Sequence, residues 1–426
     1  MQKVSKKTKI GIIGLGYVGL NLAIEFSKKF NVVGFEASKN RISELKNGVD
    51  KTKEVSKSSL LASKNLFLTN SSENLRICNV YIITVPTPIN SNKKPDLKML
   101  LTATKTIGGL LKKGNVVIYE STVYPGATEE ECIPVLEKIS NLKINKDFYC
   151  GYSPERINPG DKKHKLIDVV KLTSGSNKKT ANFVDLLYSK IIRAGTYMTS
   201  SIRVAEAAKV IENTQRDLNI ALVNEFSIIF NSLDLDTGEI LNAAKTKWNF
   251  LNFYPGLVGG HCISVDPYYL TFKSQQVGYN PKVILSGRYV NDQMGVYVAK
   301  KLIKQMKKRK LLRNNNKILL MGIAFKENCP DIRNSRVFDI IKVLTKENLK
   351  IEVYDPVADT SSIKKKSYFQ FIDSIKKNHY DSIIIAVAHD IFKKMGIRKI
   401  RSFGKKNSLI YDLKSIFNNN DVDFSL

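Results

Sequence analysis

The sequence is 426 residues long and 43% hydrophobic, enough for two or three domains with buried cores. It contains no apolar run of the roughly 20 residues that span a bilayer, and its first residues lead into a short strand and not into a signal-peptide core. We therefore expect a cytoplasmic protein with no membrane association.

The net charge of +29 raises the question of a nucleic-acid or anionic-lipid partner, because a basic surface attracts polyanions. The lysines are spread along the whole chain among asparagine, isoleucine and serine, and no recognition motif is visible. This pattern is typical of a compositional bias, so we expect no nucleic-acid partner. The five cysteines are scattered and never spaced Cys-x-x-Cys, which indicates neither a disulfide framework nor a metal site.

The first predicted elements form a dinucleotide-binding unit. A short apolar strand at Thr8–Ile13 leads into Gly14-Leu-Gly-Tyr-Val-Gly19, and a helical pattern follows. In this setting Gly14 permits a tight turn, Gly16 lets the backbone approach a pyrophosphate, and Gly19 allows close packing of the helix. The N-terminus of that helix faces the phosphate charge.

The next strand, Asn31–Phe35, ends in Glu36. An acid at this place can bond the ribose hydroxyls and repel a 2′-phosphate. The sequence therefore predicts NAD, and not NADP, as the cofactor.

Two further strands are expected at Val80–Val85 and Asn115–Tyr119, and each leads into a loop that contains proline, Pro86–Pro88 or Glu120–Gly126. Ligands bind at the carboxyl ends of parallel strands, so these loops should line the cofactor cleft. Thr122 is either a hydroxyl at the site or a turn former, and the spacing leaves both open.

Another strand-like stretch ends in the loop Cys150–Gly160, which presents Glu155 and Arg156 between prolines. Either these two side chains belong to the site, or they form a surface salt bridge. The residues themselves leave both interpretations open.

A long helix is predicted from Ile202 to Leu233, where neither glycine nor proline interrupts the pattern. Lys209 and Asn213 lie four residues apart and share one face of it. Lys209 lies among alanines, so one interpretation is a partly desolvated lysine that acts as an electrophile or proton donor. The alternative is a surface lysine whose stem packs on the helix while its ammonium reaches water. The helix is also long and apolar enough to form a dimer seam.

The loop Pro255–Pro267 sets Cys262 in a glycine-rich turn, with Asp266 four residues on. Its three glycines, Gly256, Gly259 and Gly260, permit backbone dihedrals and close approaches that suit a loop around a ligand. A thiolate there can attack a carbonyl carbon. The alternative is that Cys262 is one more small buried residue in an ordinary turn.

The last third of the chain predicts a second α/β pattern, in which Lys326 and Arg333 follow a strand and are placed to hold phosphates. The predicted fold class is therefore α/β, with two Rossmann-like doubly wound domains joined by a long central helix. The expected strands are Lys317–Gly322, Lys350–Asp355, Asp381–Val387 and Leu409–Asp412.

Together these motifs resemble the nucleotide-sugar 6-dehydrogenase family, from the fingerprint at Gly14 to the strand near Asp412. The resemblance is carried by Gly-Leu-Gly-Tyr-Val-Gly, Thr-Val-Pro-Thr-Pro, Glu-Ser-Thr-Val-Tyr-Pro-Gly, Ser-Pro-Glu-Arg, Gly-Gly-His-Cys-Ile-Ser-Val-Asp-Pro and Ala-Phe-Lys-Glu-Asn. The strings Glu-Asn-Thr-Gln-Arg-Asp-Leu-Asn-Ile-Ala and Gly-Gly-His-Cys-Ile are similar to the branch that oxidises UDP-N-acetylglucosamine or UDP-N-acetylgalactosamine for bacterial surface polysaccharides.

The resemblance implies a homodimer that oxidises the sugar C6 alcohol to a carboxylate with two NAD⁺, for capsule or O-antigen synthesis. In the family, the first hydride transfer gives an aldehyde and a cysteine adds to it. The second hydride transfer gives a thioester, and water releases the acid. The implied domains are an NAD-binding domain at 1–200, a central helical and dimerisation region with the cysteine loop at 201–300, and a UDP-sugar-binding domain at 301–426.

Carried over to this sequence, Cys262 is the nucleophile, and Lys209 and Asn213 stabilise the oxygen as it becomes anionic. Asp266 assists proton transfer and hydrolysis, with Thr122 positioning a water. Glu155 lies between substrate and cofactor. The expected cofactor contacts are Gly14, Gly16, Tyr17, Val18, Gly19, Glu36, Arg41, Thr84, Pro86, Thr87, Ser121, Thr122 and Arg333. The expected substrate contacts are Glu155, Arg156, Lys209, Asn213, Phe250, Leu251, Phe253, Gly256, Gly259, Phe325 and Lys326.

The sequence departs from the family pattern in two places. Members often carry an arginine that reaches the partner's substrate, but Lys247–Phe253 contains none. An Asp-x-Arg motif near the C-terminus reads Asp412-Leu-Lys414, so Lys414 stands in for a bidentate phosphate binder. The alternatives are a UDP-glucose or UDP-N-acetylmannosamine 6-dehydrogenase and, more remotely, a nucleotide-sugar epimerase or reductase, which typically uses a Tyr-x-x-x-Lys pair.

Overall fold

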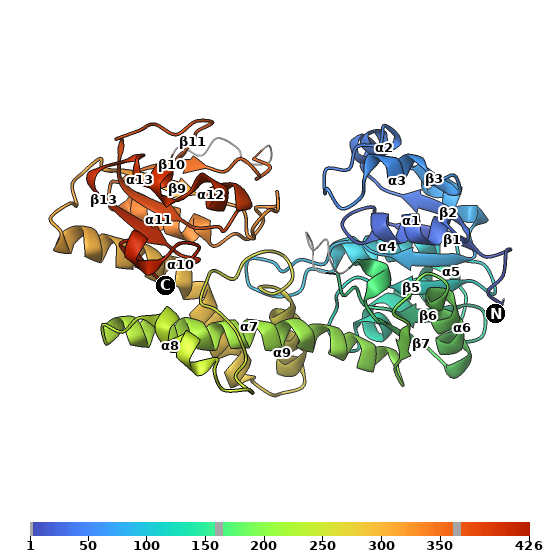
Figure 1. The fold of residues 1–426 in the computed structure, drawn as a ribbon. Helices are drawn as coiled ribbons and strands as arrows, with labels where there is room; N and C mark the ends of the chain where they lie inside the picture. Colours follow the sequence, from blue (N-terminus) through green and yellow to red (C-terminus); the bar gives the residue numbers. More distant parts are fainter. Residues whose placement is uncertain (1–2, 158–164, 361–367) are drawn as a thin grey trace. The chain divides into compact units, whose positions relative to one another are not determined.

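The computed structural model describes residues 3–157, 165–360 and 368–426, apart from the side chain of Asn419. Within these ranges the chain forms two compact units. The first contains the residues up to Glu212 together with Tyr268–Asn280, and the second contains Asn213–Pro267 and the residues from Pro281 onward. Each unit is built on one mainly or wholly parallel sheet (Figure 1).

The sheet of the first unit has the strand order β3-β2-β1-β4-β5-β6-β7-β8, and β6 and β7 are its antiparallel pair. The order reverses between β1 and β4, which is where an open parallel sheet binds its ligands. The strands are β1 (Lys9–Ile13), β2 (Asn31–Phe35), β3 (Leu66–Thr69), β4 (Val80–Ile83), β5 (Val116–Tyr119), β6 (Tyr149–Tyr152), β7 (Lys171–Gly175) and β8 (Thr196–Met198). The helices are α1 (Gly19–Ser27), α2 (Lys39–Lys46), α3 (Lys57–Leu61), α4 (Lys98–Gly108), α5 (Ile133–Ser140), α6 (Lys178–Ser189) and α9 (Asp266–Gln276), with the single turns η1 (Ser72–Ile77), η2 (Thr128–Cys132) and η3 (Leu166–Asp168).

Apolar residues on both faces explain why these strands lie inside the unit. The strands β4 and β5 are buried along their whole length, as parallel strands covered on two sides are. Helices α1 and α6 pack over the face that carries Ile10, Ile12 and Ile82. Helix α4 contacts β4 and packs against α5.

The sheet of the second unit is parallel throughout, with the order β11-β10-β9-β12-β13-β14. Helices α10 and α11 cover the face of Ile318, Leu320 and Ile384, and α12 and α13 cover the opposite face. The strands are β9 (Lys317–Met321), β10 (Lys350–Tyr354), β11 (Gln370–Phe371), β12 (Tyr380–Ile385), β13 (Gly404–Asp412) and β14 (Phe424–Ser425). The helices are α8 (Thr237–Ala244), α10 (Lys282–Lys308), α11 (Val337–Lys346), α12 (Asp390–Met395) and α13 (Ile397–Arg401), with the turn η4 (Asn419–Asp421).

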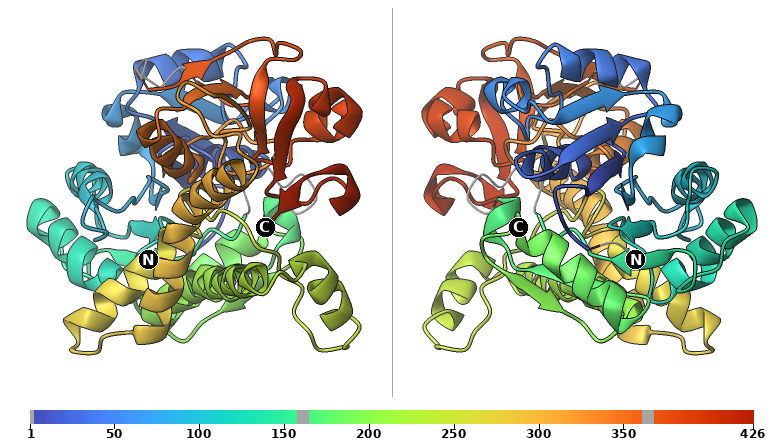
Figure 2. Two further views of the ribbon diagram at one scale, coloured as in Figure 1. Left: turned by 90° about the vertical axis from the view of Figure 1, so that its left-hand side faces the viewer. Right: turned by 90° about the vertical axis from the view of Figure 1, so that its right-hand side faces the viewer.

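The predicted long helix is confirmed as α7 (Ile202–Ser232), which begins in the first unit and ends in the second (Figures 1 and 2). The fold class is thereby confirmed. Most predicted strand limits differ from the observed ones by one or two residues, and the largest error is at β13, which begins at Gly404 and not at Leu409. Its first residues are polar, and their place in the strand comes from backbone pairing of Gly404 with Tyr380 and not from apolar burial.

The expected three-part division, with boundaries at residues 200 and 300, stays a proposal. Across the described ranges, no helix combines the length and the apolar character that a membrane span requires.

Candidate active site

The glycine loop joins β1 to α1 at the carboxyl edge of the first sheet. Gly14 has a φ of 95°, which a residue with a Cβ rarely adopts. A Cβ on Gly19 would lie 1.8 Å from the carbonyl oxygen of Gly14, so the turn and the helix can meet only at glycine. Among the described residues, no atom lies within 4 Å of where a Cβ on Gly16 would stand. The backbone at Gly16 is therefore open to a pyrophosphate, which is the fit that NAD requires.

Glu36 follows β2 and lies against this loop. Its Oε2 accepts a hydrogen bond from the backbone N–H of Leu15 at 3.0 Å, and its Oε1 accepts one from Ser38 at 3.2 Å. Arg41 donates from Nη2 to the carbonyl oxygen of Leu15 at 3.1 Å and to Asp50 at 2.7 Å. Glu36 thus binds the backbone N–H of Leu15, and Arg41 binds its carbonyl oxygen. These bonds keep the Glu36 carboxylate beside the glycine loop.

The loops after β4 and β5 are tied to the glycine loop and to each other. The Thr84 hydroxyl lies 2.7 Å from the carbonyl oxygen of Gly14. Ser121 donates to the carbonyl oxygen of Val85 at 2.6 Å, and Thr87 donates to that of Thr122 at 2.6 Å. The predicted cofactor residues Thr84, Pro86, Thr87, Ser121 and Thr122 therefore lie in one connected set of loops at the switch point.

Sequence reasoning missed Tyr269, a fully buried residue of α9 that donates from its hydroxyl to the carbonyl oxygen of Thr87 at 2.8 Å. Tyr269 lies three residues after Asp266, within the first turn of the same helix. The feature of the sequence that could have predicted its role is an aromatic residue only three positions after Asp266.

Glu155 and Arg156 have separate partners. Glu155 is 8% exposed, and its Oε1 accepts hydrogen bonds from the backbone N–H groups of Arg156 and Ile157 at 2.8 and 2.5 Å. Arg156 forms an ion pair with Glu212 of α7 at 2.8 Å. The two side chains are therefore not paired with each other, and the carboxylate of Glu155 is held inside the first unit.

On α7, Lys209 is 7% exposed, so it is a buried lysine and not a snorkelling one. Glu206, one turn before it, is fully buried and accepts backbone hydrogen bonds from Gly126 and Thr128 at 2.6 and 2.9 Å. Burial raises the pKa of Glu206 to about 7. Asn213, one turn after Lys209, donates from Nδ2 to Oδ2 of Asp266 at 2.6 Å.

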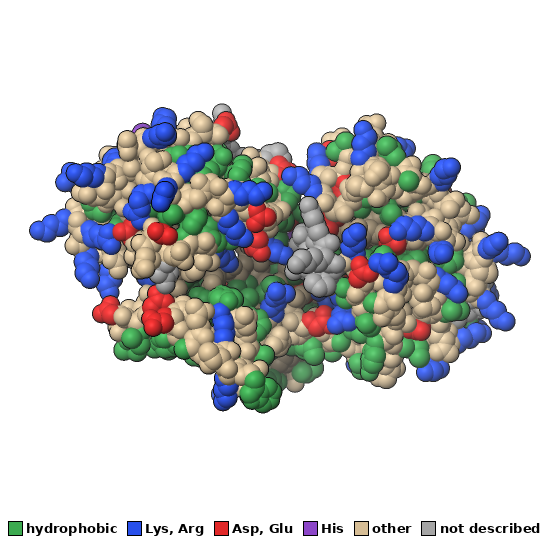
Figure 3. All heavy atoms as spheres, in the orientation of Figure 1, with side chains coloured by type: hydrophobic (Ala, Val, Ile, Leu, Met, Phe, Trp, Pro, Cys, Tyr) green, Lys and Arg blue, Asp and Glu red, His purple; other side chains and the backbone are tan. Residues whose placement is uncertain are grey.

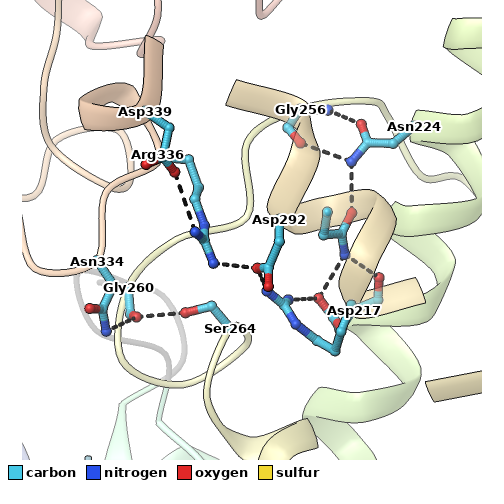
Figure 4. A network of polar contacts seen from close by, with 11 residues as sticks. Asp217, Asn224, Gly256, Gly260, Ser264, Asp292, Asn334, Arg336 and Asp339 are labelled. Carbon is cyan, nitrogen blue, oxygen red and sulfur yellow. Dashed lines mark hydrogen bonds and ion pairs between the residues drawn. The ribbon is translucent and has the colours of Figure 1, made fainter. Parts of the chain in front are cut away.

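The cysteine loop lies in the second unit, and its glycines are required by close neighbours. Gly260 has a φ of 84°, and a Cβ on it would lie 2.7 Å from the ring of Phe325. A Cβ on Gly259 would lie 2.7 Å from the carbonyl oxygen of Asn334. The carbonyl oxygen of Gly260 accepts hydrogen bonds from Ser264 at 2.7 Å and from Asn334 at 3.0 Å (Figure 4). The turn is thus fixed by Ser264 from within the loop and by Phe325 and Asn334 from outside it.

Cys262 is partly exposed, whereas the other four cysteines are buried. Its carbonyl oxygen accepts hydrogen bonds from the backbone N–H groups of Val265 and Asp266 at 2.9 and 2.8 Å. Asp266, at 2% exposure, begins α9. The thiol is therefore accessible, while the acid that follows it is buried.

The start of the same loop is held by a polar network from α7, α10 and α11. The side-chain amide of Asn224 bonds both backbone groups of Gly256, at 2.7 and 3.0 Å, and lies 2.8 Å from Asn291 (Figure 4). Asn291 in turn donates to Asp217 at 2.7 Å. Buried Arg288 pairs with Asp217 and Asp292, and Arg336 pairs with Asp292 and Asp339.

A small pocket in the second unit contains several of the predicted substrate residues. Lys326 and Phe325 line it together with Gly259 and Lys414. A Cβ on Gly256 would lie 2.9 Å from the ammonium of Lys414, and burial lowers the pKa of that lysine. The ammonium of Lys414 therefore lies against the backbone of Gly256, at the start of the cysteine loop.

Buried His389 and Asp355 hold the segment that carries Lys326. Nδ1 of His389 accepts the backbone N–H of Asn328 at 2.9 Å, and Nε2 lies 3.2 Å from Asp355. Asp355 accepts the N–H groups of Ile323 and Ala324 at 2.7 and 3.1 Å. Both ends of the Lys326 segment are thereby fixed.

The remaining predicted residues lie in different surroundings. Arg333 donates hydrogen bonds to Asp331 at 2.5 to 3.0 Å, and its Nη2 lies 3.4 Å from Nδ1 of His261, so it lies beside the cysteine loop. Phe250 and Phe253 are half-buried, and Leu251 is 60% exposed. These three residues follow α8 on a loop of the second unit.

Three domain descriptions of one family match the chain in order. They are the NAD binding domain at residues 8–192, the central domain at 203–293 and the UDP binding domain at 319–419. The chain belongs to the UDP-glucose/GDP-mannose dehydrogenase family. It is an NAD-dependent nucleotide-sugar dehydrogenase.

Relatives within this family match the chain along its length. It is 55% identical to a UDP-N-acetyl-D-glucosamine 6-dehydrogenase of Salmonella typhi, with 96% of each chain covered. It is 53% identical to a UDP-N-acetyl-D-glucosamine 6-dehydrogenase of Pseudomonas aeruginosa, with 99% of this chain and all of that one covered. Among solved structures, a UDP-D-ManNAc dehydrogenase from Pyrococcus horikoshii aligns with a TM-score of 0.85 at 29% identity, with 96% of each chain covered.

Proposed function

We propose that this protein is a UDP-N-acetyl-D-glucosamine 6-dehydrogenase. The observation that carries the proposal is the identity of more than half of all residues, over nearly the whole chain, with two relatives of that name. The relative of the mannosamine type is also similar in fold but at 29% identity, which favours the glucosamine substrate.

The proposed reaction converts the C6 alcohol, two NAD⁺ and one water into the carboxylate, two NADH and three protons. NAD⁺, when bound, accepts one hydride in each oxidation. The Cys262 thiol adds to the aldehyde carbon, and the resulting thioester is cleaved by water, which returns the thiol. A thiol is needed between the two oxidations because its adduct keeps a hydrogen on carbon that can leave as hydride.

The proposed roles of the other residues follow from where they lie. Lys209 and Asn213 share a face of α7 and donate hydrogen bonds to the oxygen as it becomes anionic. Asp266 and Thr122 act in proton transfer and hydrolysis, and Glu155 lies between substrate and cofactor. The phosphates are bound by Lys326 in the pocket that Lys414 completes.

Purified protein is to be incubated with NAD⁺ and, in turn, UDP-N-acetylglucosamine, UDP-N-acetylgalactosamine, UDP-N-acetylmannosamine and UDP-glucose. We expect the highest kcat/KM with UDP-N-acetylglucosamine and two NADH per sugar. A higher value with another sugar would contradict the substrate, and one NADH per sugar would contradict the two-step reaction. A Cys262→Ser variant is expected to bind NAD⁺ normally but to form no acid.

We further propose that the protein forms a homodimer through α7. Four apolar residues of this helix recur along one face at helical spacing, Leu233 directly after the helix continues the stripe, and all five are 46 to 61% exposed: Val204, Ile211, Leu222, Ile229 and Leu233. An exposed apolar stripe of this length marks a protein interface. Light scattering after size exclusion tests this, and an Ile211→Asp and Ile229→Asp double variant should run as a monomer.

The basic charge supports no second function. Lysine and arginine side chains are scattered over the face drawn in Figure 3 and do not gather over one element. A cytoplasmic location and a product used for surface polysaccharide are part of the same proposal. Salt-sensitive binding of DNA by the pure protein would contradict the statement that the basic charge supports no second function.

A further inference from the structure

A buried ionic cluster lies beneath the loops of the first unit that carry Thr122 and Glu155. Lys171, the first residue of β7, is 2% exposed. Its ammonium lies 2.7 Å from Oε2 of Glu120, 3.0 Å from the carbonyl oxygen of Pro154 and 3.6 Å from Oε2 of Glu155. One cation thus joins the residue before Ser121 to the loop that follows β6.

Glu120, the residue directly after β5, completes the cluster. It is 1% exposed, and its Oε1 accepts a hydrogen bond from the hydroxyl of Tyr188 on α6. Burial raises the pKa of Glu120 to about 7, although the Lys171 ammonium lowers it. The ring of Tyr188 lies 5.5 Å from the same ammonium.

Such a lysine is costly to bury, because an ammonium loses its hydration unless acceptors replace it. A hydrophobic residue would serve the packing of β7 equally well. The position of Lys171 is informative because two of its three oxygen partners belong to Pro154 and Glu155. Glu155 is held on Oε1 by two backbone N–H groups, while its buried Oε2 has no hydrogen-bond partner among the described residues. That oxygen faces Lys171 at ion-pair distance.

We propose that Lys171 is a positioning residue for Glu155: its ammonium holds the Pro154 carbonyl and the Glu155 carboxylate in place, and Glu120 is its counter-ion. The inference rests on the proposed role of Glu155 in the reaction. Lys171 itself contacts no substrate; it sets the direction in which Glu155 presents its carboxylate.

The main test is the double variant Glu120→Gln and Lys171→Met, which removes both buried charges together and keeps their volumes. We expect a melting temperature near that of the native enzyme and nearly unchanged KM for NAD⁺ and the UDP-sugar. We expect kcat to fall about 10- to 100-fold, as misplacement of a catalytic group does. A kcat within twofold of the native value would overturn the proposal. Lys301→Met, which changes a half-buried lysine in the second unit, is the control and should keep kcat.

A cycle with Glu155→Gln separates positioning from general stabilisation. If Lys171 acts through Glu155, the double change should lower kcat less than threefold further in the Glu155→Gln background. A loss of 10-fold or more in both backgrounds would overturn the proposal. If the double variant does not fold, the same comparison with and without Glu155→Gln is made with the single variant Lys171→Gln. This variant should fold because the glutamine amide can still donate a hydrogen bond to Glu120.

A measurement without substrate keeps the inference distinct from the proposed function. The amide protons of Arg156 and Ile157 should exchange with deuterium faster in the double variant, since both bond the Glu155 carboxylate. Unchanged exchange would overturn the positioning role even if the native enzyme oxidises the sugar. Faster exchange in a protein whose native form oxidises none of the four UDP-sugars would support Lys171 and contradict only the proposed function.

Discussion

Asn213 on α7 donates a hydrogen bond from its side-chain amide to the buried carboxylate of Asp266, 2.6 Å away at the start of α9. The part of α7 that lies in the second unit is thereby joined to the end of the cysteine loop. We expect Asn213→Leu to lower kcat about 10²- to 10³-fold, the loss typical of removing one donor to a developing oxyanion. Asn219→Leu, six residues along the same helix and on another face of it, should leave kcat within a few fold. Equal losses in both variants would show that the effect belongs to the helix and not to Asn213.

Cys262 is the cysteine with partial exposure, so it should react first with iodoacetamide. We expect mass spectrometry to place the first carbamidomethyl group on Cys262, in step with the loss of activity, and UDP-sugar to slow both. The other cysteines lie in the cores of the two units and should react only after unfolding. First modification at Cys78 or Cys132 would contradict this prediction.

Gly260 and Gly114 both have a positive φ, of 84° and 87°, but only at Gly260 would a Cβ meet another side chain, the ring of Phe325. Alanine at either position costs about 1 to 2 kcal/mol of backbone strain. Gly260→Ala should also displace Phe325, beside Lys326, and raise KM for the UDP-sugar, whereas Gly114→Ala should not. Urea unfolding and steady-state kinetics measure both effects, and an unchanged KM in Gly260→Ala would contradict the assigned packing.

Asp355 should make stability fall in acid. Burial alone raises its pKa, but the His389 ring and backbone N–H groups outweigh burial and hold the pKa at about 2, below the value of 3.8. Because the folded-state pKa lies below the unfolded one, this stabilisation of roughly 2 kcal/mol is complete above about pH 4 and is lost as pH falls toward 2.

We expect Asp355→Asn to be less stable than the native protein at pH 7, and the difference to shrink between pH 4 and pH 2. Urea unfolding at pH 7, 4 and 3 measures it. Glu73→Gln, at an exposed ion pair with Arg76, is the control and should change stability by less than about 0.5 kcal/mol. A constant difference at all three pH values would contradict the assignment.

The sequence by itself was enough to predict the dinucleotide loop, the long helix and the cysteine turn, because each depends on local properties. The glycine spacing from Gly14 to Gly19, the stretch from Ile202 to Leu233 without glycine or proline, and the glycines before Cys262 can all be read without knowledge of any neighbour. The acid at Glu36 is equally local, since it ends a strand whose place beside the glycine loop follows from the βαβ pattern.

Only the tertiary structure decided which polar residues are buried and what holds them. Lys171 follows two valines in the chain and resembles an ordinary strand lysine, yet Glu120 from the end of β5 and Tyr188 from α6 both contact its ammonium. Gly259 is required by the carbonyl oxygen of Asn334, and Lys326 is held through His389 and Asp355. Such contacts join residues tens of positions apart in the chain. Burial and ion pairing depend on distances in space, and a periodic pattern along the chain does not give those distances.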